Sequence, residues 1–84
     1  MRFQRNGSIV TADLHGVYER DARDILYGWL DRAPADVTEL RVIHGYTRGT
    51  TLRDMIRGEF SHPRVKSVIP SLNPGATRLI LEKK

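Results

Sequence analysis

The chain has 84 residues, enough for one small domain with a single hydrophobic core. Its net charge of +4 favours an acidic partner, most commonly nucleic acid, although a solvated basic surface without a partner has the same charge. Because the chain has no cysteine, disulfides and thiolate metal sites are excluded. No apolar run approaches the roughly 20 residues that span a bilayer, so we expect no membrane partner and a cytoplasmic protein.

The first half of the chain predicts a strand, a helix and a second strand. Residues 1–7 are polar and are expected to form a lead-in or a short edge segment, and residues 8–14 form the first strand. From Val17 apolar side chains recur with helical spacing until Pro34 ends the helix. Residues 39–43 are typical of a second short strand. The apolar stripe of the helix comprises Ala22, Ile25, Leu26, Trp29, Leu30 and Ala33.

The second half predicts a helix and two strands. Residues 51–60 carry apolar side chains on one helical face, and His62-Pro63 ends this helix, with His62 expected at the surface. Residues 65–69 and 77–82 form two strands joined by a turn rich in Pro, Asn and Gly.

The order of elements is therefore strand, helix, strand, helix, strand, strand. It predicts an α/β fold, a two-layer α/β sandwich with a mixed four-stranded sheet and two helices. We expect a single domain over residues 1–84, with its core at about 8–82. Strand–helix–strand units are almost always parallel, so the first two strands end at the same edge of the sheet. Open α/β sheets usually bind ligands at that edge.

A carboxylate and an imidazole stand at the end of the first strand. Asp13 and His15 project to one side of it, where the pair would orient the imidazole for proton transfer or simply stabilise the turn. His44 ends the second strand and is a candidate for proton transfer or phosphate binding. We predict Asp13, His15 and His44 as catalytic residues. No metal ligand is predicted, because neither an H-x-x-x-H motif nor an acidic cluster accompanies them.

The loop from His44 to Gly49 leads into the second helix. Backbone N–H groups at a helix start bind anions, and glycines let a phosphate approach closely. Thr51 and Asp54 have the spacing of a capping box, so a tight turn followed by a capped helix explains the same residues. The residues predicted to bind nucleic acid are Gly45, Arg48, Gly49, Thr51 and Arg53.

These motifs occur together in one order and, as a set, resemble a known family. The chain resembles the small MutS-related (Smr) domain family over essentially residues 8–82. The matching residues are Asp13-Leu14-His15-Gly16, Ala22, His44-Gly45 with Gly49, Leu52-Arg53, His62-Pro63-x-Val65 and Gly75-Ala76-Thr77.

The resemblance implies a two-layer α/β sandwich similar to the carboxyl-terminal domain of bacterial translation initiation factor 3. Family members are linked to nicking of branched or duplex DNA, to RNA endonuclease action on ribosome-bound mRNA, and to ribosome rescue. The family's DxH pair falls on Asp13 and His15, and its HGxGxG loop falls on residues 44–49 and would bind the nucleic-acid backbone. This sequence departs from the pattern at Ala12, where leucine is usual, and at Thr47, where the loop has its middle glycine.

Two functions follow from these expectations. The first is a nucleic-acid-binding domain with endonuclease activity, cleaving phosphodiester bonds of RNA or branched DNA. No cofactor is certain, but a divalent metal, Mg or Mn, is conceivable for DNA, where water must be activated. The alternative is a module that binds nucleic acid or the ribosome without cutting; a structural or protein-interaction domain ranks third. We expect RNA or DNA and the ribosome as partners, and a monomer.

Overall fold

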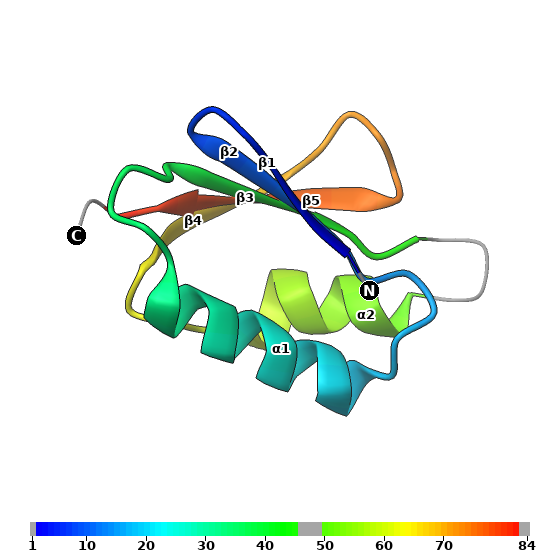
Figure 1. The fold of residues 1–84 in the computed structure, drawn as a ribbon. Helices are drawn as coiled ribbons and strands as arrows, with labels where there is room; N and C mark the ends of the chain where they lie inside the picture. Colours follow the sequence, from blue (N-terminus) through cyan, green and yellow to red (C-terminus); the bar gives the residue numbers. More distant parts are fainter. Residues whose placement is uncertain (1, 46–49, 83–84) are drawn as a thin grey trace.

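The computed structural model describes residues 2–45 and 50–82 and has two layers, with both helices on one side of a mixed five-stranded sheet (Figure 1). The order across the sheet is β1-β2-β3-β5-β4. Only β2 and β3 pair in parallel, and the other neighbours are antiparallel. The predicted α/β class and the two layers are confirmed. In chain order the elements are β1 (Arg2–Asn6), β2 (Ile9–Asp13), α1 (Glu19–Arg32), β3 (Glu39–Ile43), α2 (Thr51–Asp54), the π-helical turn η1 (Met55–Glu59), β4 (Val65–Pro70) and β5 (Ala76–Leu81).

The prediction of four strands was wrong, because β1 forms an edge strand. It pairs antiparallel with β2 through a tight turn at Gly7, whose φ is 66°. Only Phe3 of β1 packs against the core, where its ring stacks on Trp29 with the centroids 5.6 Å apart. A solvated edge strand needs few apolar residues, so its polar sequence gives little periodic signal.

The two strands that carry the candidate histidines end together, as predicted. Asp13 in β2 is in register with Ile43 in β3. Just beyond, the backbone N–H of Leu14 donates to the carbonyl of Ile43 at 2.8 Å. The segments that follow the two strands therefore leave the sheet at one rim.

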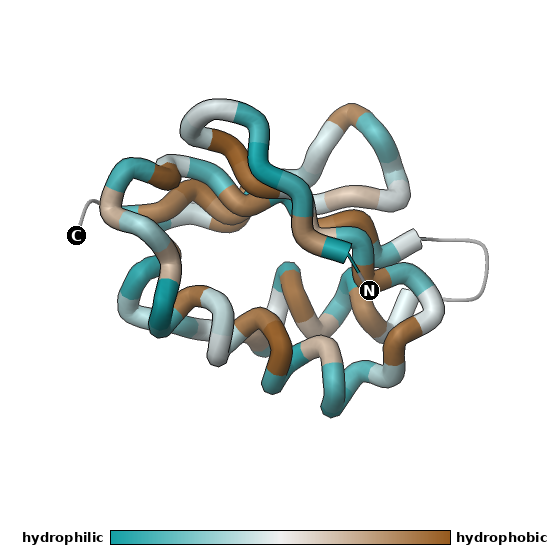
Figure 2. The backbone as a smooth tube through the Cα atoms, viewed as in Figure 1, coloured by the Kyte–Doolittle hydropathy of each residue, from teal (hydrophilic) through white to brown (hydrophobic). Residues whose placement is uncertain are grey.

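The core lies between the sheet and the helices. Strand residues such as Leu40 and Val42 alternate inward, and α1 contributes Ala22, Leu26 and Leu30 from one face. Figure 2 shows hydrophobic residues recurring along both helices and the central strands. Within residues 2–45 and 50–82, no helix is long and apolar enough to cross a membrane.

The second helix differs from its predicted regular form. After the four residues of α2 it widens into η1, and the N–H of Phe60 donates to the carbonyl of Met55 at 2.7 Å, five residues back. Met55 and Ile56 are both fully buried there. Single π-turns inside helices often occur at functional sites. This one lies beside the rim described above.

His62, expected at the surface, is instead buried between α1 and β4. Its Nε2–H donates to Asp31 at 2.8 Å, and its Nδ1 accepts the backbone N–H of Arg64 at 2.9 Å. The buried guanidinium of Arg64 donates to four backbone carbonyls, which include two directly after α1. The Arg64 cation lies near the C-terminus of α1, where positive charge is favoured. Arg64 and His62 together tie the end of α1 to β4 and to the end of β5.

Candidate active site

Asp13 and His15 form a hydrogen-bonded pair at the end of β2. Nδ1 of His15 donates to Oδ1 of Asp13 at 2.5 Å, and the same oxygen faces the backbone N–H of His15 at 3.3 Å. The side chain of His15 is 69% exposed. Both interpretations from the sequence thus coexist, because the carboxylate stabilises the turn and also orients the imidazole.

The direction of this bond fixes the form of the neutral imidazole. An ionised carboxylate can only accept, so Nδ1 of His15 carries the hydrogen and Nε2 keeps its lone pair. The hydrogen bond from the His15 ring holds the pKa of the Asp13 carboxyl below its usual 3.8. Asp13 therefore stays ionised at neutral pH. The pair presents an oriented base to solvent.

Gly45 lies directly against this pair. Its φ of 77° is a left-handed conformation that favours glycine, and a Cβ built on it would lie 3.5 Å from Cβ of His15. The fold therefore brings the segment after β3 next to the segment after β2. The predicted proximity of the two histidine-bearing ends is confirmed at the level of Gly45 and His15.

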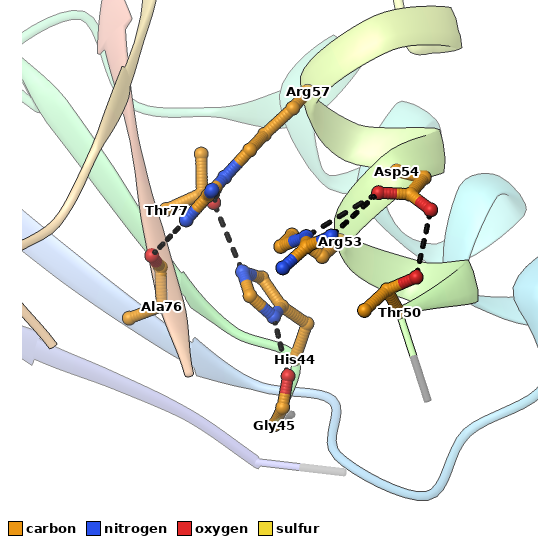
Figure 3. Close-up of polar contacts among 8 residues, drawn as sticks. All are labelled: His44, Gly45, Thr50, Arg53, Asp54, Arg57, Ala76 and Thr77. Carbon is orange, nitrogen blue, oxygen red and sulfur yellow. Dashed lines mark hydrogen bonds and ion pairs between the residues drawn. The ribbon is translucent and has the colours of Figure 1, made fainter. Parts of the chain in front are cut away.

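His44 itself points into the protein rather than toward solvent (Figure 3). Nδ1 donates to the carbonyl of Gly45 at 2.8 Å, and Nε2 accepts from the hydroxyl of the buried Thr77 at 2.9 Å. Thr77 in turn accepts from Nε of Arg57 at 2.8 Å. Since arginine only donates and a carbonyl only accepts, these three bonds fit the neutral imidazole with its hydrogen on Nδ1.

Burial lowers the pKa of His44 below 6.5, and the nearby charges of Arg57 and Arg53 lower it further. The His44 imidazole is therefore neutral at pH 7. Both of its ring nitrogens are engaged, so any transfer of a proton through His44 requires one of these bonds to break. This geometry favours a positioning role for His44 over a direct one.

Arg57 and Thr77 belong to this site, although the sequence analysis predicted neither as a site residue. Figure 3 shows Arg57 reaching from the second helix to β5, where its Nη2 also donates to the carbonyl of Ala76 at 3.1 Å. The carbonyl of Gly75 accepts the backbone N–H groups of both His44 and Gly45. The matched motif Gly75-Ala76-Thr77 was the available signal, but only the pairing of β3 with β5 places it beside His44.

The predicted nucleic-acid-binding residues lie unevenly around this centre. Arg53 is near His44 and donates to Asp54 at 3.2 and 3.3 Å, and Thr51 is exposed as the first residue of α2. The hydroxyl of Thr50 donates to Asp54, and no capping box forms at Thr51. Because α2 has only four residues, its dipole is small and contributes little to the binding of an anion. Arg48 and Gly49 fall outside the described residues, as does Thr47.

The described residues do not fit a divalent metal site. No group of three His, Cys, Asp or Glu side chains gathers anywhere in residues 2–45 and 50–82. Mg²⁺ in proteins usually takes carboxylate oxygens. Among the described residues, the imidazoles of His15 and His44 bond directly to one carboxylate, that of Asp13.

Comparison with known proteins decides the family. The family model of the Smr domain matches residues 12–72, most of the chain. This chain belongs to the Smr domain family. The fold agrees, since this Smr domain is similar to the crystal structure of the Smr domain of Thermus thermophilus MutS2, with a TM-score of 0.66 and 25% sequence identity. The match covers 86% of this Smr domain and 96% of that chain. No curated protein sequence matches it.

Proposed function

We propose that this Smr domain binds nucleic acid and cleaves phosphodiester bonds at the Asp13–His15 pair. The observation that carries the proposal is the 2.5 Å bond from Nδ1 of His15 to Asp13, together with the exposure of the imidazole. Membership of the Smr family and the net charge of +4 support nucleic acid as the substrate.

Each residue of the pair has its own role in the proposed reaction. On RNA, Nε2 of His15 takes the proton of the 2′-hydroxyl, and the 2′-oxygen attacks the adjacent phosphorus. The bond from phosphorus to the 5′-oxygen of the next nucleotide breaks, and that oxygen takes a proton from solvent. Asp13 keeps the imidazole oriented and stabilises the imidazolium while it exists. On DNA, water would replace the 2′-hydroxyl.

Neighbouring residues hold the phosphate and the backbone around it. Arg53 offers a guanidinium beside the rim, and guanidinium groups stabilise the negative charge that develops on phosphoryl oxygens. Gly45 packs against His15, and His44 fixes the carbonyl of Gly45. In this proposal His44 is a positioning residue. Phosphate binding by Arg48 and Gly49 stays a prediction.

The test is an endonuclease assay on single-stranded RNA and on branched DNA. Replacing His15 with Ala removes the base and is expected to lower the rate of cleavage by about 100- to 10,000-fold, the usual contribution of general acid–base catalysis. Asp13→Asn is expected to lower the rate as well, because the amide offers Nδ1 a hydrogen bond but no negative charge. Equal cleavage by wild type and His15→Ala would overturn the assignment.

The chain contains a matched control for this experiment. Asp31 and His62 form a second hydrogen-bonded pair of the same residue types, but the imidazole of His62 is only 5% exposed. Asp31→Asn makes the same chemical change at the C-terminal end of α1, whereas Asp13 and His15 precede the start of that helix, and it is expected to leave the cleavage rate unchanged. A loss of activity equal to that of Asp13→Asn would mean that both variants act through stability.

The alternative is a domain that binds nucleic acid without cutting it. The departure from the family pattern at Thr47 favours this alternative, since glycine lets a backbone approach phosphate more closely. Salt-sensitive binding of RNA or DNA without turnover would support it. A ribosomal partner, a monomeric state and a cytoplasmic location remain predictions that accompany either function.

A further inference from the structure

The sheet has a face that neither helix covers, on the side opposite α1 and α2 (Figure 1). We call it the open face. Leu40 and Val42 of β3 point into the core, so the alternating residues Glu39, Arg41 and Ile43 belong to the open face. The register places Arg41 beside Arg78 of β5. The open face therefore carries two arginines near its centre.

Arg41 and Arg78 are directly opposite each other on antiparallel strands. Like charges in this arrangement destabilise a sheet unless an anion lies between them. Glu39 provides one: its carboxylate accepts from Arg78 at 2.9 and 3.1 Å and from Nε of Arg41 at 2.5 Å. Glu39 is only 7% exposed, and the bonds from Arg78, followed by the bond from Arg41, lower its pKa below 4.5.

One carboxylate offsets only one of the two guanidinium groups. The three side chains together keep a net positive charge, and the side chains of Arg41 and Arg78 are 49% and 38% exposed. Within the part of the chain that the structure describes, the side chain of Arg41 uses only its Nε in a hydrogen bond. The bond from Nε to Glu39 restrains the guanidinium of this half-exposed side chain. A prearranged guanidinium pair of this kind suits a phosphate, which accepts two parallel hydrogen bonds.

The pair also lies near the candidate active site. Asp13 is the last residue of β2, and its partner Ile43 is the last residue of β3. Arg41 is two residues before Ile43, about 7 Å along the strand. The side chain of Asp13 is on the open face, because its neighbour Ala12 is in the core face of β2. A strand of nucleic acid held at His15 therefore reaches the arginine pair by continuing across the open face.

We propose that Arg41 and Arg78 form a second phosphate-binding site, which holds the backbone of a nucleic-acid strand as it leaves the Asp13–His15 pair. The proposal rests on the proposed nucleic-acid function and adds to it the path of the strand. It assigns Glu39 as the residue that positions both guanidinium groups. Contact with nucleic acid, rather than with an acidic protein, follows from the residual positive charge beside a site for phosphodiester chemistry.

The test measures binding of a fluorescently labelled single-stranded RNA by anisotropy at several salt concentrations. All variants carry His15→Ala, so that turnover does not interfere. The double change Arg41→Gln with Arg78→Gln is expected to weaken binding about tenfold, near the lower end of the range for one bidentate contact, and to reduce the salt slope by about one unit. The matched control is Arg20→Gln with Arg32→Gln, which removes the same charge from exposed positions of α1. The control is expected to change the affinity only slightly.

A third variant changes the affinity in the opposite direction. Glu39→Gln removes the negative charge between the arginines but keeps a side-chain oxygen that can accept hydrogen bonds from them. RNA is therefore expected to bind more tightly and with a steeper salt dependence. Thermal unfolding of each variant checks that the domain is folded at the assay temperature. Should Glu39→Gln fail to fold, the comparison of the two double arginine variants still decides the matter.

The outcomes separate this inference from the proposed cleavage. Equal affinity of the Arg41/Arg78 and Arg20/Arg32 variants overturns the second phosphate site, even if the wild type cleaves RNA. A specific loss of affinity in the Arg41/Arg78 variant supports the site, even if the wild type cleaves nothing. Binding of an acidic protein through these arginines, without RNA binding, also overturns it.

Discussion

The hydroxyl of Thr77 lies 2.9 Å from Nε2 of His44 and is the end point of the hydrogen bond from Arg57. One buried oxygen thereby connects β5, the end of β3 and the π-turn η1. His44 also bonds to the carbonyl of Gly45, and Gly45 packs against His15. The Thr77 oxygen is therefore connected to the exposed Asp13–His15 pair through His44 and Gly45. The site is held together by a chain of contacts that lies behind it.

Thr77→Val is the direct test of this connection. Valine keeps the shape but leaves Nε2 of the buried His44 and one Arg57 donor without their partner, which is expected to cost about 1–3 kcal/mol in the free energy of unfolding. Thr77→Ser keeps the hydroxyl and is expected to retain most of the stability. Urea denaturation of the two variants measures the difference, and equal values for Val and Ser would contradict a role for the hydroxyl.

The lowered pKa of His44 gives stability a definite pH dependence. The folded chain holds His44 neutral, whereas the unfolded chain takes up a proton as the pH falls through 6.5, so the unfolding free energy decreases below that pH. His44→Gln cannot titrate, and its stability is expected to fall less between pH 7 and 5. Denaturation curves of the wild type and His44→Gln at both pH values test this. Both proteins contain His15 and His62, so the difference between their pH profiles reports on His44. Parallel pH profiles would show that His44 has an ordinary pKa in the folded state.

Gly45→Ala tests the left-handed turn beside His15. Its φ of 77° is costly for alanine, so we expect a loss of roughly 1–2 kcal/mol in stability. In the nuclease assay we also expect slower cleavage, because the shifted backbone would move against Cβ of His15. Gly28→Ala is the control: Gly28 is inside α1 with nothing near its added Cβ, and alanine is expected to stabilise the helix by about 0.5–1 kcal/mol. Opposite signs for the two changes are the expected result.

Arg64→Met tests the buried cation at the end of α1. Methionine fills part of the space but leaves the carbonyls of Ala33, Pro34, Val37 and Glu82 without this donor. Since each unmade bond is costly in a buried place, we expect a loss of roughly 2–4 kcal/mol. Arg32→Met, at an exposed position in the last turn of the same helix, is expected to stay within about 0.5 kcal/mol of wild type. Thermal unfolding compares them.

Much of the fold could be predicted because it is recorded in local patterns. The apolar stripe that ends in Leu30 and Ala33 predicts α1, and the alternation of Leu79 and Leu81 predicts β5, because each period matches the geometry of its element. The polar strand β1 could not be found this way. Its residues take part in the sheet through backbone hydrogen bonds, which any sequence can form.

For the candidate site, the sequence by itself determined the Asp13–His15 pair. Two residues of spacing at the end of a strand place both side chains on one side, and their chemistry then forms the bond. Only the tertiary structure decided that His44 bonds to Thr77 and that Arg57 bonds to the same hydroxyl. It also decided that Arg41 lies opposite Arg78, with Glu39 bonded to both. These contacts join residues far apart in the chain. They depend on which strands pair, and the hydrophobic alternation within one strand shows which of its side chains are buried but does not identify the strand beside it.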